Sequence, residues 1–215
     1  MIETYVTTDE HYGHPKVIDS CDRPAASIDE HDAMLVDRFN STVTHTNALT
    51  FHLGDTILGT NRLERIRDIL AALNGNHVLV PGNHCKPFAG SLGGWKHVRD
   101  YIEAGFDSVV AYTPFKLPQT SPERPGRVVM FSHFPYDGDS RPGEERHVAA
   151  RLRDEGIPIV HGHIHTAGKI TRSRRGTLQV NAGVDVWNYA PVSVKTLAAL
   201  MDDELGTDVG SSGLY

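Results

Sequence analysis

The stretch Leu49-Thr50-Phe51-His52-Leu53-Gly54-Asp55 is a short run of apolar and β-forming residues that ends in glycine and aspartate. Such a run is too short for a helix and is typical of a buried strand. Similar runs occur at residues 4–7, 77–80, 128–131 and 157–160, and a polar cluster follows each of them. The sequence therefore predicts five buried strands.

Helical patterns lie between these strands. Ser27 is expected to cap a helix that continues to Asn40. Asn61 is expected to cap a second helix that continues to Leu73, with Asn74-Gly75 as its stop signal. A third helix is expected at residues 144–155. Strands that alternate with helices predict an α/β fold with open sheets.

The pattern changes after Gly168, where helical signals become rare. The runs at residues 177–180 and 192–194 are expected to be strands of a second sheet. Residues 117–126 are rich in proline and serine and are expected to form a hairpin loop.

Length and composition limit the possible protein classes. A chain of 215 residues suits one domain, which we expect at residues 1–201, with a mobile tail at residues 202–215. The hydrophobic share of 39% and the charged share of 22% are typical of a soluble globular protein. No apolar run approaches the ~18 residues that span a bilayer, and no secretory signal is recognisable, so no membrane partner is expected.

Charge and cysteine content narrow the classes further. A net charge of -6 argues against non-specific binding of nucleic acid as the main activity. The chain has two cysteines, Cys21 and Cys85, and this low number argues against a disulfide scaffold and favours a cytoplasmic location. The unusual feature of the composition is its 13 histidines, and their positions relative to the predicted strands decide whether they indicate a site.

Each of the five expected strands is followed by Asp, Asn or His. In chain order these residues are Asp9, His11, Asp55, Asn83, His84, His133, His163 and His165. Ligands of open α/β sheets bind at the carboxyl ends of the strands, so these side chains are expected to meet at one site.

The residue types indicate a metal site, because imidazole nitrogen and carboxylate or amide oxygen are ligands of first-row transition metals. Without His84 the set has seven members, which exceeds the needs of one tetrahedral ion and suits two ions that share a ligand. In an extended chain the Asp-x-His and His-x-His spacing would direct both side chains to one centre. Glycines at 54, 82 and 162 are expected to allow the backbone to approach that centre.

In order and placement these motifs resemble those of the calcineurin-like metallophosphoesterase superfamily. The resemblance covers roughly residues 1–200. It is strongest to a group of small capless bacterial and phage phosphoesterases, with which the chain shares His11-x-Gly13-His14, Cys21-x-Arg23-Pro24, His52-Leu53-Gly54-Asp55 and Val184-Asp185-Val186-Trp187-Asn188.

The resemblance implies a four-layer αββα sandwich of two mixed sheets flanked by helices. It also implies two divalent transition-metal ions, with manganese expected and iron, zinc and nickel also suited to these ligands. By position, Asp9, His11 and His165 would hold one ion, Asn83, His133 and His163 would hold the other, and Asp55 would bridge them. A hydroxide between the ions would attack phosphorus, and His84 would act as the general acid.

The chain departs from the superfamily pattern at two places. Cys85 occupies a position that is often acidic, and Thr56-Ile57 follows Asp55 where an Asp-Arg pair is frequent. An acidic residue near that motif can orient the catalytic histidine in related enzymes. In its absence, His52 or a backbone carbonyl is the alternative partner of His84.

Substrate contacts are expected at His14 and Asn40, although a loop-packing role for His14 and a helix-terminal role for Asn40 remain open. His161, His52 and Trp187 are interpreted as core or supporting residues, and Cys85 as a small buried filler. The basic run Arg172, Arg174 and Arg175 is either a solvated face or a guide for an anionic polymer.

The expected function is hydrolysis of phosphate esters, with diesters such as nucleotides or nucleic-acid ends favoured because a chain without a cap has an open cleft. The alternatives are a phosphomonoesterase and a binding module that has lost catalysis. A metallo-β-lactamase fold is excluded, since Thr166-Ala167-Gly168 follows His163-Ile164-His165 in place of the required pattern. The sequence does not reveal the oligomeric state.

Overall fold

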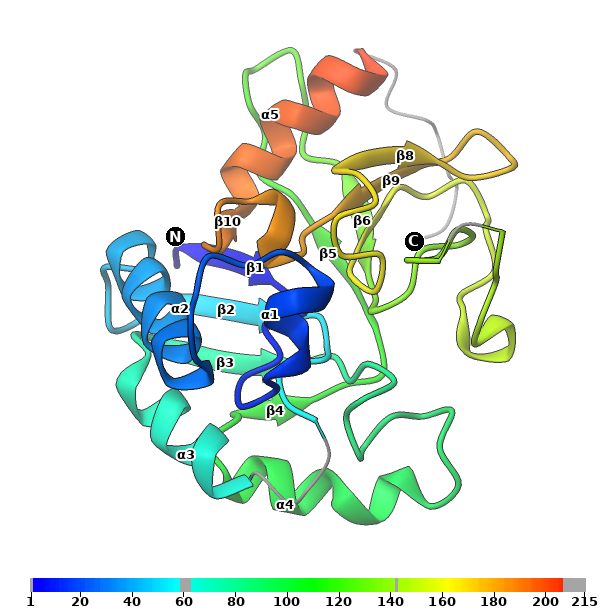
Figure 1. Ribbon diagram of the computed structural model, residues 1–215. Coiled ribbons are helices and arrows are strands. Elements are labelled where there is room, and N and C mark those ends of the chain that lie inside the picture. The colour runs from blue at the N-terminus through cyan, green and yellow to red at the C-terminus, as the bar shows by residue number, and fades with distance from the viewer. Residues whose placement is uncertain (1, 59–62, 142, 207–215) are drawn as a thin grey trace.

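The computed structural model describes residues 2–58, 63–141 and 143–206. Its described part contains two mixed sheets of five strands each, with helices beside them (Figure 1). This architecture confirms the expected α/β class with two mixed sheets flanked by helices.

The first sheet has the strand order β10-β1-β2-β3-β4. Strands β1 to β4 run parallel to one another, and β10 is antiparallel to β1, with Tyr5 opposite Ser193. The bounds are β1 (Thr4–Thr7), β2 (Leu49–His52), β3 (Asn76–Leu79), β4 (Ser108–Val109) and β10 (Val192–Ser193).

The second sheet has the order β5-β6-β7-β9-β8. Its three central strands are parallel, and the edge strands β5 and β8 are antiparallel to their neighbours. The bounds are β5 (Thr113–Lys116), β6 (Val128–Phe131), β7 (Ile159–His161), β8 (Ile170–Arg172) and β9 (Leu178–Asn181).

Three helices contribute to the core on one face of the first sheet, namely α2 (Ile28–Thr42), α3 (Leu63–Ala72) and α4 (Val98–Glu103) (Figure 1). Helix α2 begins at Ser27, whose hydroxyl accepts a hydrogen bond from the backbone N–H of Glu30. Its buried side chains, among them Leu35 and Phe39, pack with Ile66 of α3. Burial of these apolar stripes fixes the helices against the sheet.

A second core lies between the sheets and extends to α5 (Val194–Leu205). Phe131 is its central aromatic residue, with ring centroids 5.2 Å from Phe51 and 4.9 Å from Phe115. The ring centroid of Phe51 also lies 5.6 Å from that of Phe115, so Phe51 joins β2 of the first sheet to β5 and β6 of the second and holds the two sheets together.

The remaining helical elements are short. They are α1 (Lys16–Ser20) and three 3₁₀ turns, η2 (Gly94–His97), η3 (Val148–Ala150) and η4 (Val184–Val186). The loop before η3 lies over the face of β9 opposite the core, where the Gln179 side chain accepts a hydrogen bond from Tyr136 N–H at 2.7 Å.

Most elements agree with the sequence expectations. All five predicted strands are present, and residues 117–126 join the antiparallel strands β5 and β6 as a hairpin loop. The expected cap at Asn61 lies outside the described residues. No helix among the described residues has the length and apolar character required to cross a membrane.

Three expectations were wrong. The run near residue 192 forms β10 in the first sheet, because it pairs with β1. Residues 144–155 contain only η3, since His147 takes a left-handed φ of 58° and the Arg151 side chain donates to the carbonyls of Pro135 and Gly138, contacts that fold the segment as a loop. Helix α5 continues to Leu205, beyond the expected start of the tail at Asp202, and residues 207–215 lie outside the described part.

Replacement of Phe131 by alanine is expected to lower the free energy of unfolding by about 3–5 kcal/mol, because it leaves a cavity between the sheets. Urea denaturation followed by circular dichroism measures this change. Leu92→Ala is the control, since the Leu92 side chain is fully exposed, and its effect should stay within about 0.5 kcal/mol. Equal losses in both variants would contradict the assigned core.

Candidate metal centre

The candidate site lies where the carboxyl ends of the two sheets meet. The turn after β1 pairs with the turn after β2, since Asp9 N–H donates to the Gly54 carbonyl at 3.0 Å and His11 N–H to the Asp55 carbonyl at 3.0 Å. The turn after β7 joins the turn after β6 through Gly162 N–H and the His133 carbonyl, at 2.9 Å. The backbone therefore joins the polar turns within each sheet. Val184 N–H, which follows β9, donates to the Thr8 carbonyl at 3.1 Å and links the second sheet to the turn after β1.

Most expected ligands have a left-handed backbone. The φ angles are positive at Asp9 (60°), His11 (54°), Asp55 (51°), His163 (71°) and His165 (49°). The prediction that Asp9-x-His11 and His163-x-His165 have an extended backbone is therefore wrong. Non-glycine residues adopt this conformation at a cost, and its repetition at one site is a common property of functional centres.

Two glycines allow the close approach that the site requires. A Cβ atom on Gly82 would lie 2.2 Å from Asp55 Oδ1, and one on Gly162 would lie 2.4 Å from Asp9 Oδ2. Both contacts are far shorter than atoms tolerate, so no larger residue fits without displacing a carboxylate.

The first group consists of Asp9, His11 and His165, whose potential ligand atoms lie within 4.8 Å of one another. Asp9 is fully buried. Its Oδ2 accepts hydrogen bonds from the Thr8 hydroxyl and from His163 N–H, but its Oδ1 has no hydrogen-bond partner among the described residues. Both ring nitrogens of His11 are also buried without a partner there. Such atoms are costly to bury, and a cation between them would remove the cost.

Burial also shifts the pKa values of this group. Desolvation raises the pKa of the Asp9 carboxyl and lowers the pKa of His11 well below its ordinary value. Burial lowers the pKa of His165, but the Asp9 carboxylate, the hydrogen bond with Asp185 and the Cys21 side chain together outweigh it, and the pKa rises to about 11. Within this group, His165 thus supplies the positive charge that faces Asp9.

The second group consists of Asp9, Asp55 and His133, again within 4.8 Å. His133 Nδ1 donates to the Leu53 carbonyl at 2.7 Å, which directs Nε2 toward the centre. There Nε2 lies 3.3 Å from Asp55 Oδ2 and 3.3 Å from Asn83 Oδ1. Three atoms that bear lone pairs therefore converge, and they attract a proton or a metal cation.

The electrostatics of this group agree with that geometry. Burial by itself would lower the pKa of His133 and raise that of Asp55, but their mutual attraction outweighs it, so the pKa of His133 rises and the pKa of Asp55 falls below its ordinary range. Asp9 belongs to both groups, whereas the resemblance implied Asp55 as the shared ligand.

His163 approaches the second group from the β7 turn, with its ring centroid 5.4 Å from that of His133. Its Nε2 lies 3.1 Å from Asp139 Oδ2, and burial lowers its pKa to about 3. The neutral ring therefore donates from Nε2 to the carboxylate, which leaves the lone pair of Nδ1 available to an ion.

His84 and His14 stand beside the first group. The ring centroid of His11 lies 5.3 Å from that of His84 and 5.5 Å from that of His14. The His84 side chain is 40% exposed, and its backbone N–H donates to Asp55 Oδ1 at 2.9 Å. His84 is thus anchored to the site while its ring remains accessible.

The expected alternative partner of His84 lies elsewhere. His52 is fully buried, with Nδ1 2.7 Å from Glu10 Oε1 and Nε2 3.1 Å from His77 Nδ1. Both ring nitrogens are therefore occupied, and His52 does not orient His84.

Asn40 is not brought to the site. Its amide donates to the Ala72 carbonyl and accepts from Asn74 N–H, so it joins α2 to the segment that precedes β3. That segment is at the amino-terminal edge of the sheet, opposite the candidate centre. The helix-terminal interpretation of Asn40 is therefore favoured over contact with a substrate.

Sequence reasoning missed three residues that support the site. Asp139 contacts His163, and Asp185 contacts His165 Nδ1 at 3.1 Å. Arg23, almost fully buried, forms an ion pair with Asp185 at 2.8 Å. Arg23 and Asp185 belong to shared motifs and could have been suspected, whereas Asp139 has no distinguishing signal in the sequence.

A cleft of ≈ 290 Å³ opens onto the centre. Its lining includes Asp55, Asn83, His84, His163 and His165 together with Arg141 and Arg146 from the loop before η3. The cleft therefore combines the candidate ligands with two cationic side chains, which suits an anionic substrate.

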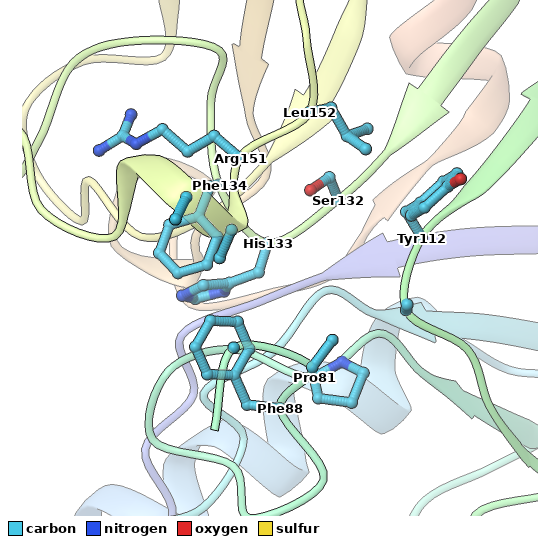
Figure 2. A pocket seen from close by; sticks show the side chains of 13 residues that line it. Pro81, Phe88, Tyr112, Ser132, His133, Phe134, Arg151 and Leu152 are labelled. Carbon is cyan, nitrogen blue, oxygen red and sulfur yellow. The ribbon is translucent and has the colours of Figure 1, made fainter. Parts of the chain in front are cut away.

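A second hollow, of ≈ 230 Å³, lies on the other side of His133. Figure 2 shows His133 and Phe134 on one side of it and Phe88 and Pro81 on the other. Its lining is mainly apolar, and His133 is the one candidate ligand among its lining residues. This hollow is thus separate from the polar cleft.

Comparison with known proteins gives relatives without an assigned activity. No family model matches the chain. It is 32% identical to the Gene 66 protein of Mycobacterium phage D29 over 192 residues, which cover 87% of this chain and 90% of the relative. The Gene 66 protein of Mycobacterium phage L5 is 30% identical over 190 residues, with 87% and 88% covered. Uncharacterized protein MJ1445 of Methanocaldococcus jannaschii is 28% identical over 207 residues, with 94% and 93% covered.

Solved structures show a shared fold. The protein of unknown function AQ665 from Aquifex aeolicus superimposes with a TM-score of 0.64 at 21% identity, and the match covers 93% of this chain and all of that chain. Phosphopantetheinyl Hydrolase (PptH) from Mycobacterium tuberculosis reaches a TM-score of 0.37 at 15% identity, with 68% and 48% covered, a similarity too low to carry an argument.

Asp55→Ala is expected to abolish the stabilisation that Mn²⁺ gives to the folded protein, because it removes a carboxylate from the centre. Saturation of one site at 100 times its Kd adds about 2.7 kcal/mol of stability, which is visible as a rise in Tm. Asp202→Ala removes a buried carboxylate that contacts Thr120, and this control should retain the rise. A metal-induced rise that survived Asp55→Ala would contradict the site.

Cys85→Ser is expected to retain the metal-induced rise in Tm. The Cys85 thiol is buried, and burial raises its pKa to about 12, so it stays protonated at neutral pH and does not act as a thiolate ligand. Loss of Mn²⁺ binding, measured by titration calorimetry, would show that the filler interpretation of this thiol is wrong.

Proposed function

The chain belongs to the family of the Gene 66 proteins of mycobacteriophages L5 and D29, and we propose that it is a dinuclear metal-dependent phosphoesterase. Its preferred substrates are phosphodiesters, such as nucleotides or nucleic-acid ends. Manganese is the first candidate for both ions, and iron, zinc and nickel suit the same ligands.

One observation carries the proposal. Asp9 is shared by two groups of potential ligand atoms, one with His11 and His165 and one with Asp55 and His133, and no described neighbour gives a hydrogen bond to Asp9 Oδ1 or to either ring nitrogen of His11. In this proposal Asp9, His11 and His165 hold one ion, and Asp55, which lies beside His133, joins it to the second. We assign Asn83, His133 and His163 to the second ion, since His133 Nε2 lies 3.3 Å from Asn83 Oδ1 and the ring centroids of His133 and His163 are 5.4 Å apart. Two bound ions would polarise the phosphoryl oxygens and activate water.

The chain's own residues supply the remaining chemistry. Arg141 and Arg146 line the cleft and attract the negative phosphate group. His84 reaches the cleft with a ring that is exposed to substrate, and its backbone is fixed on Asp55. In this proposal His84 donates a proton to the leaving oxygen, as a general acid does.

The diester preference rests on the shape of the site. The cleft is lined by short turns and by one loop, and His84 at its edge is 40% exposed. An open cleft accepts a phosphate with organic groups on both sides. Hydrolysis of bis-p-nitrophenyl phosphate faster than p-nitrophenyl phosphate, with Mn²⁺ present, is the expected result, and the reverse order would identify a phosphomonoesterase.

His84→Ala is expected to lower kcat for the diester by ~10²–10⁴-fold while the Mn²⁺-induced rise in Tm is retained. His97→Ala is a matched control, because the His97 side chain is 39% exposed and pairs with Asp100 away from the centre. Steady-state kinetics and thermal melts separate the two effects. If His84→Ala loses the ions instead, His84 is a ligand and not the acid.

A further inference from the structure

Two carboxylates stand behind the histidines of the His163-x-His165 turn. Asp139 Oδ2 lies 3.1 Å from His163 Nε2, and Asp185 Oδ2 lies 3.1 Å from His165 Nδ1. Both carboxylate side chains are almost completely buried, at 0% and 1% exposed. Each histidine therefore has one nitrogen fixed by a carboxylate and the other available to the centre.

The carboxylate behind His165 is held by Arg23. The guanidinium donates to Asp185 through Nε at 2.8 Å and Nη2 at 3.0 Å, a bidentate ion pair that is fully buried. The same guanidinium donates to the carbonyls of Asp9 at 2.7 Å and Glu10 at 2.8 Å. Arg23 thus connects the β1 turn, which carries Asp9 and His11, to the residue behind His165.

The carboxylate behind His163 is held by a different segment. Asp139 accepts from Arg146 Nε at 3.0 Å and from Arg151 Nη2 at 3.4 Å. Both arginines come from the loop that folds around η3, and the Arg151 side chain is itself only 3% exposed. The two histidines therefore depend on separate ion-pair clusters on opposite sides of their turn.

Cys21 competes weakly for the same nitrogen of His165, with Sγ 3.4 Å from Nδ1. A thiol is a weaker acceptor than a carboxylate, so Asp185 is the partner that accepts the hydrogen bond from Nδ1–H of His165. Nε2 of His165, which lies 3.8 Å from Asp9 Oδ1, is then the nitrogen that faces the first group, and it would offer its lone pair to an ion in place of its proton.

We propose that Asp185 with Arg23 positions His165 for one ion, and that Asp139 with Arg146 and Arg151 positions His163 for the other, so that each ion depends on its own supporting cluster. The inference rests on the proposed dinuclear centre. A carboxylate behind a metal-binding histidine fixes its tautomer and ring orientation, and loss of such a partner typically lowers metal affinity ~10–100-fold.

The shared motifs gain a role under this proposal. Cys21-x-Arg23-Pro24 and Val184-Asp185-Val186 are separated by about 160 residues, yet Arg23 and Asp185 form a single unit behind one ligand. These residues do not face the substrate, so they are positioning residues and not catalytic ones.

Asp185→Asn and Asp139→Asn test the proposal by calorimetric titration of the metal-free protein with Mn²⁺. Each variant is expected to lose ~10–100-fold in affinity for one ion and to retain the wild-type affinity for the other. Anomalous scattering from Mn²⁺-soaked crystals then identifies the weakened position, which should lie at Asp9, His11 and His165 in Asp185→Asn and at Asn83, His133 and His163 in Asp139→Asn.

Asp154→Asn is the matched control. Asp154 is a carboxylate held by Ser173 and Thr177, and within the described part of the chain it makes no hydrogen bond or ion pair with a candidate ligand. The Asp154→Asn variant should have a lower Tm than the wild type in the metal-free state, and it should bind both ions with the affinity of the wild type. A purely structural role for Asp185 and Asp139 would give the same pattern as Asp154→Asn.

The outcomes are distinguishable. Unchanged affinity for both ions, or equal weakening of both ions in both variants, overturns the positioning proposal while the dinuclear centre stands. A wild-type protein that binds no Mn²⁺ overturns the proposed function, and this inference with it. If Asp185→Asn does not fold because Arg23 loses its partner, Asp139→Asn decides alone, since its cluster contains no Arg23 contact.

Discussion

The burial of Asp9 constrains the structure around it. Its carboxylate lies at the carboxyl end of the first strand with no exposed surface, and one of its oxygens has no hydrogen-bond donor among the described residues. A group of this kind is stable only if it is protonated or faces a cation. The surrounding turns, with their left-handed residues and glycines, can be understood as the means by which ligand atoms surround that oxygen.

The second constraint is the junction of the sheets. Neither sheet by itself contains a complete site, because Asp9, Asp55 and Asn83 follow strands of the first sheet and His133, His163 and His165 follow strands of the second. The aromatic contacts of Phe51 in the first sheet with Phe131 and Phe115 in the second fix how the sheets pack. The apolar core and the polar centre are consequently parts of one arrangement, in which packing determines the distances between ligands.

Rigidity around the centre comes from ion pairs that are shielded from water. Arg23 and Asp185 are both fully buried, and Asp139 gathers His163, Arg146 and Arg151 around one carboxylate. Buried pairs contribute to specificity of geometry more than to stability, because desolvation offsets much of their attraction. That balance suits a site whose histidines must each keep one nitrogen directed inward.

The sequence by itself determined the strands, the α/β class and the residues that follow each strand, because short apolar runs and Gly-Asp, Gly-Asn-His and Gly-His-x-His endings are local features. It did not determine the backbone conformation at Asp9 or His165, which is imposed by hydrogen bonds between turns of different strands. Only the tertiary structure separated Asn40 from the site, placed β10 in the first sheet and replaced an expected helix at residues 144–155 by a loop. It alone joined Arg23 to Asp185 and Asp139 to His163, since contacts between residues so distant along the chain depend on how the sheets and loops pack and leave no periodic signal in the sequence.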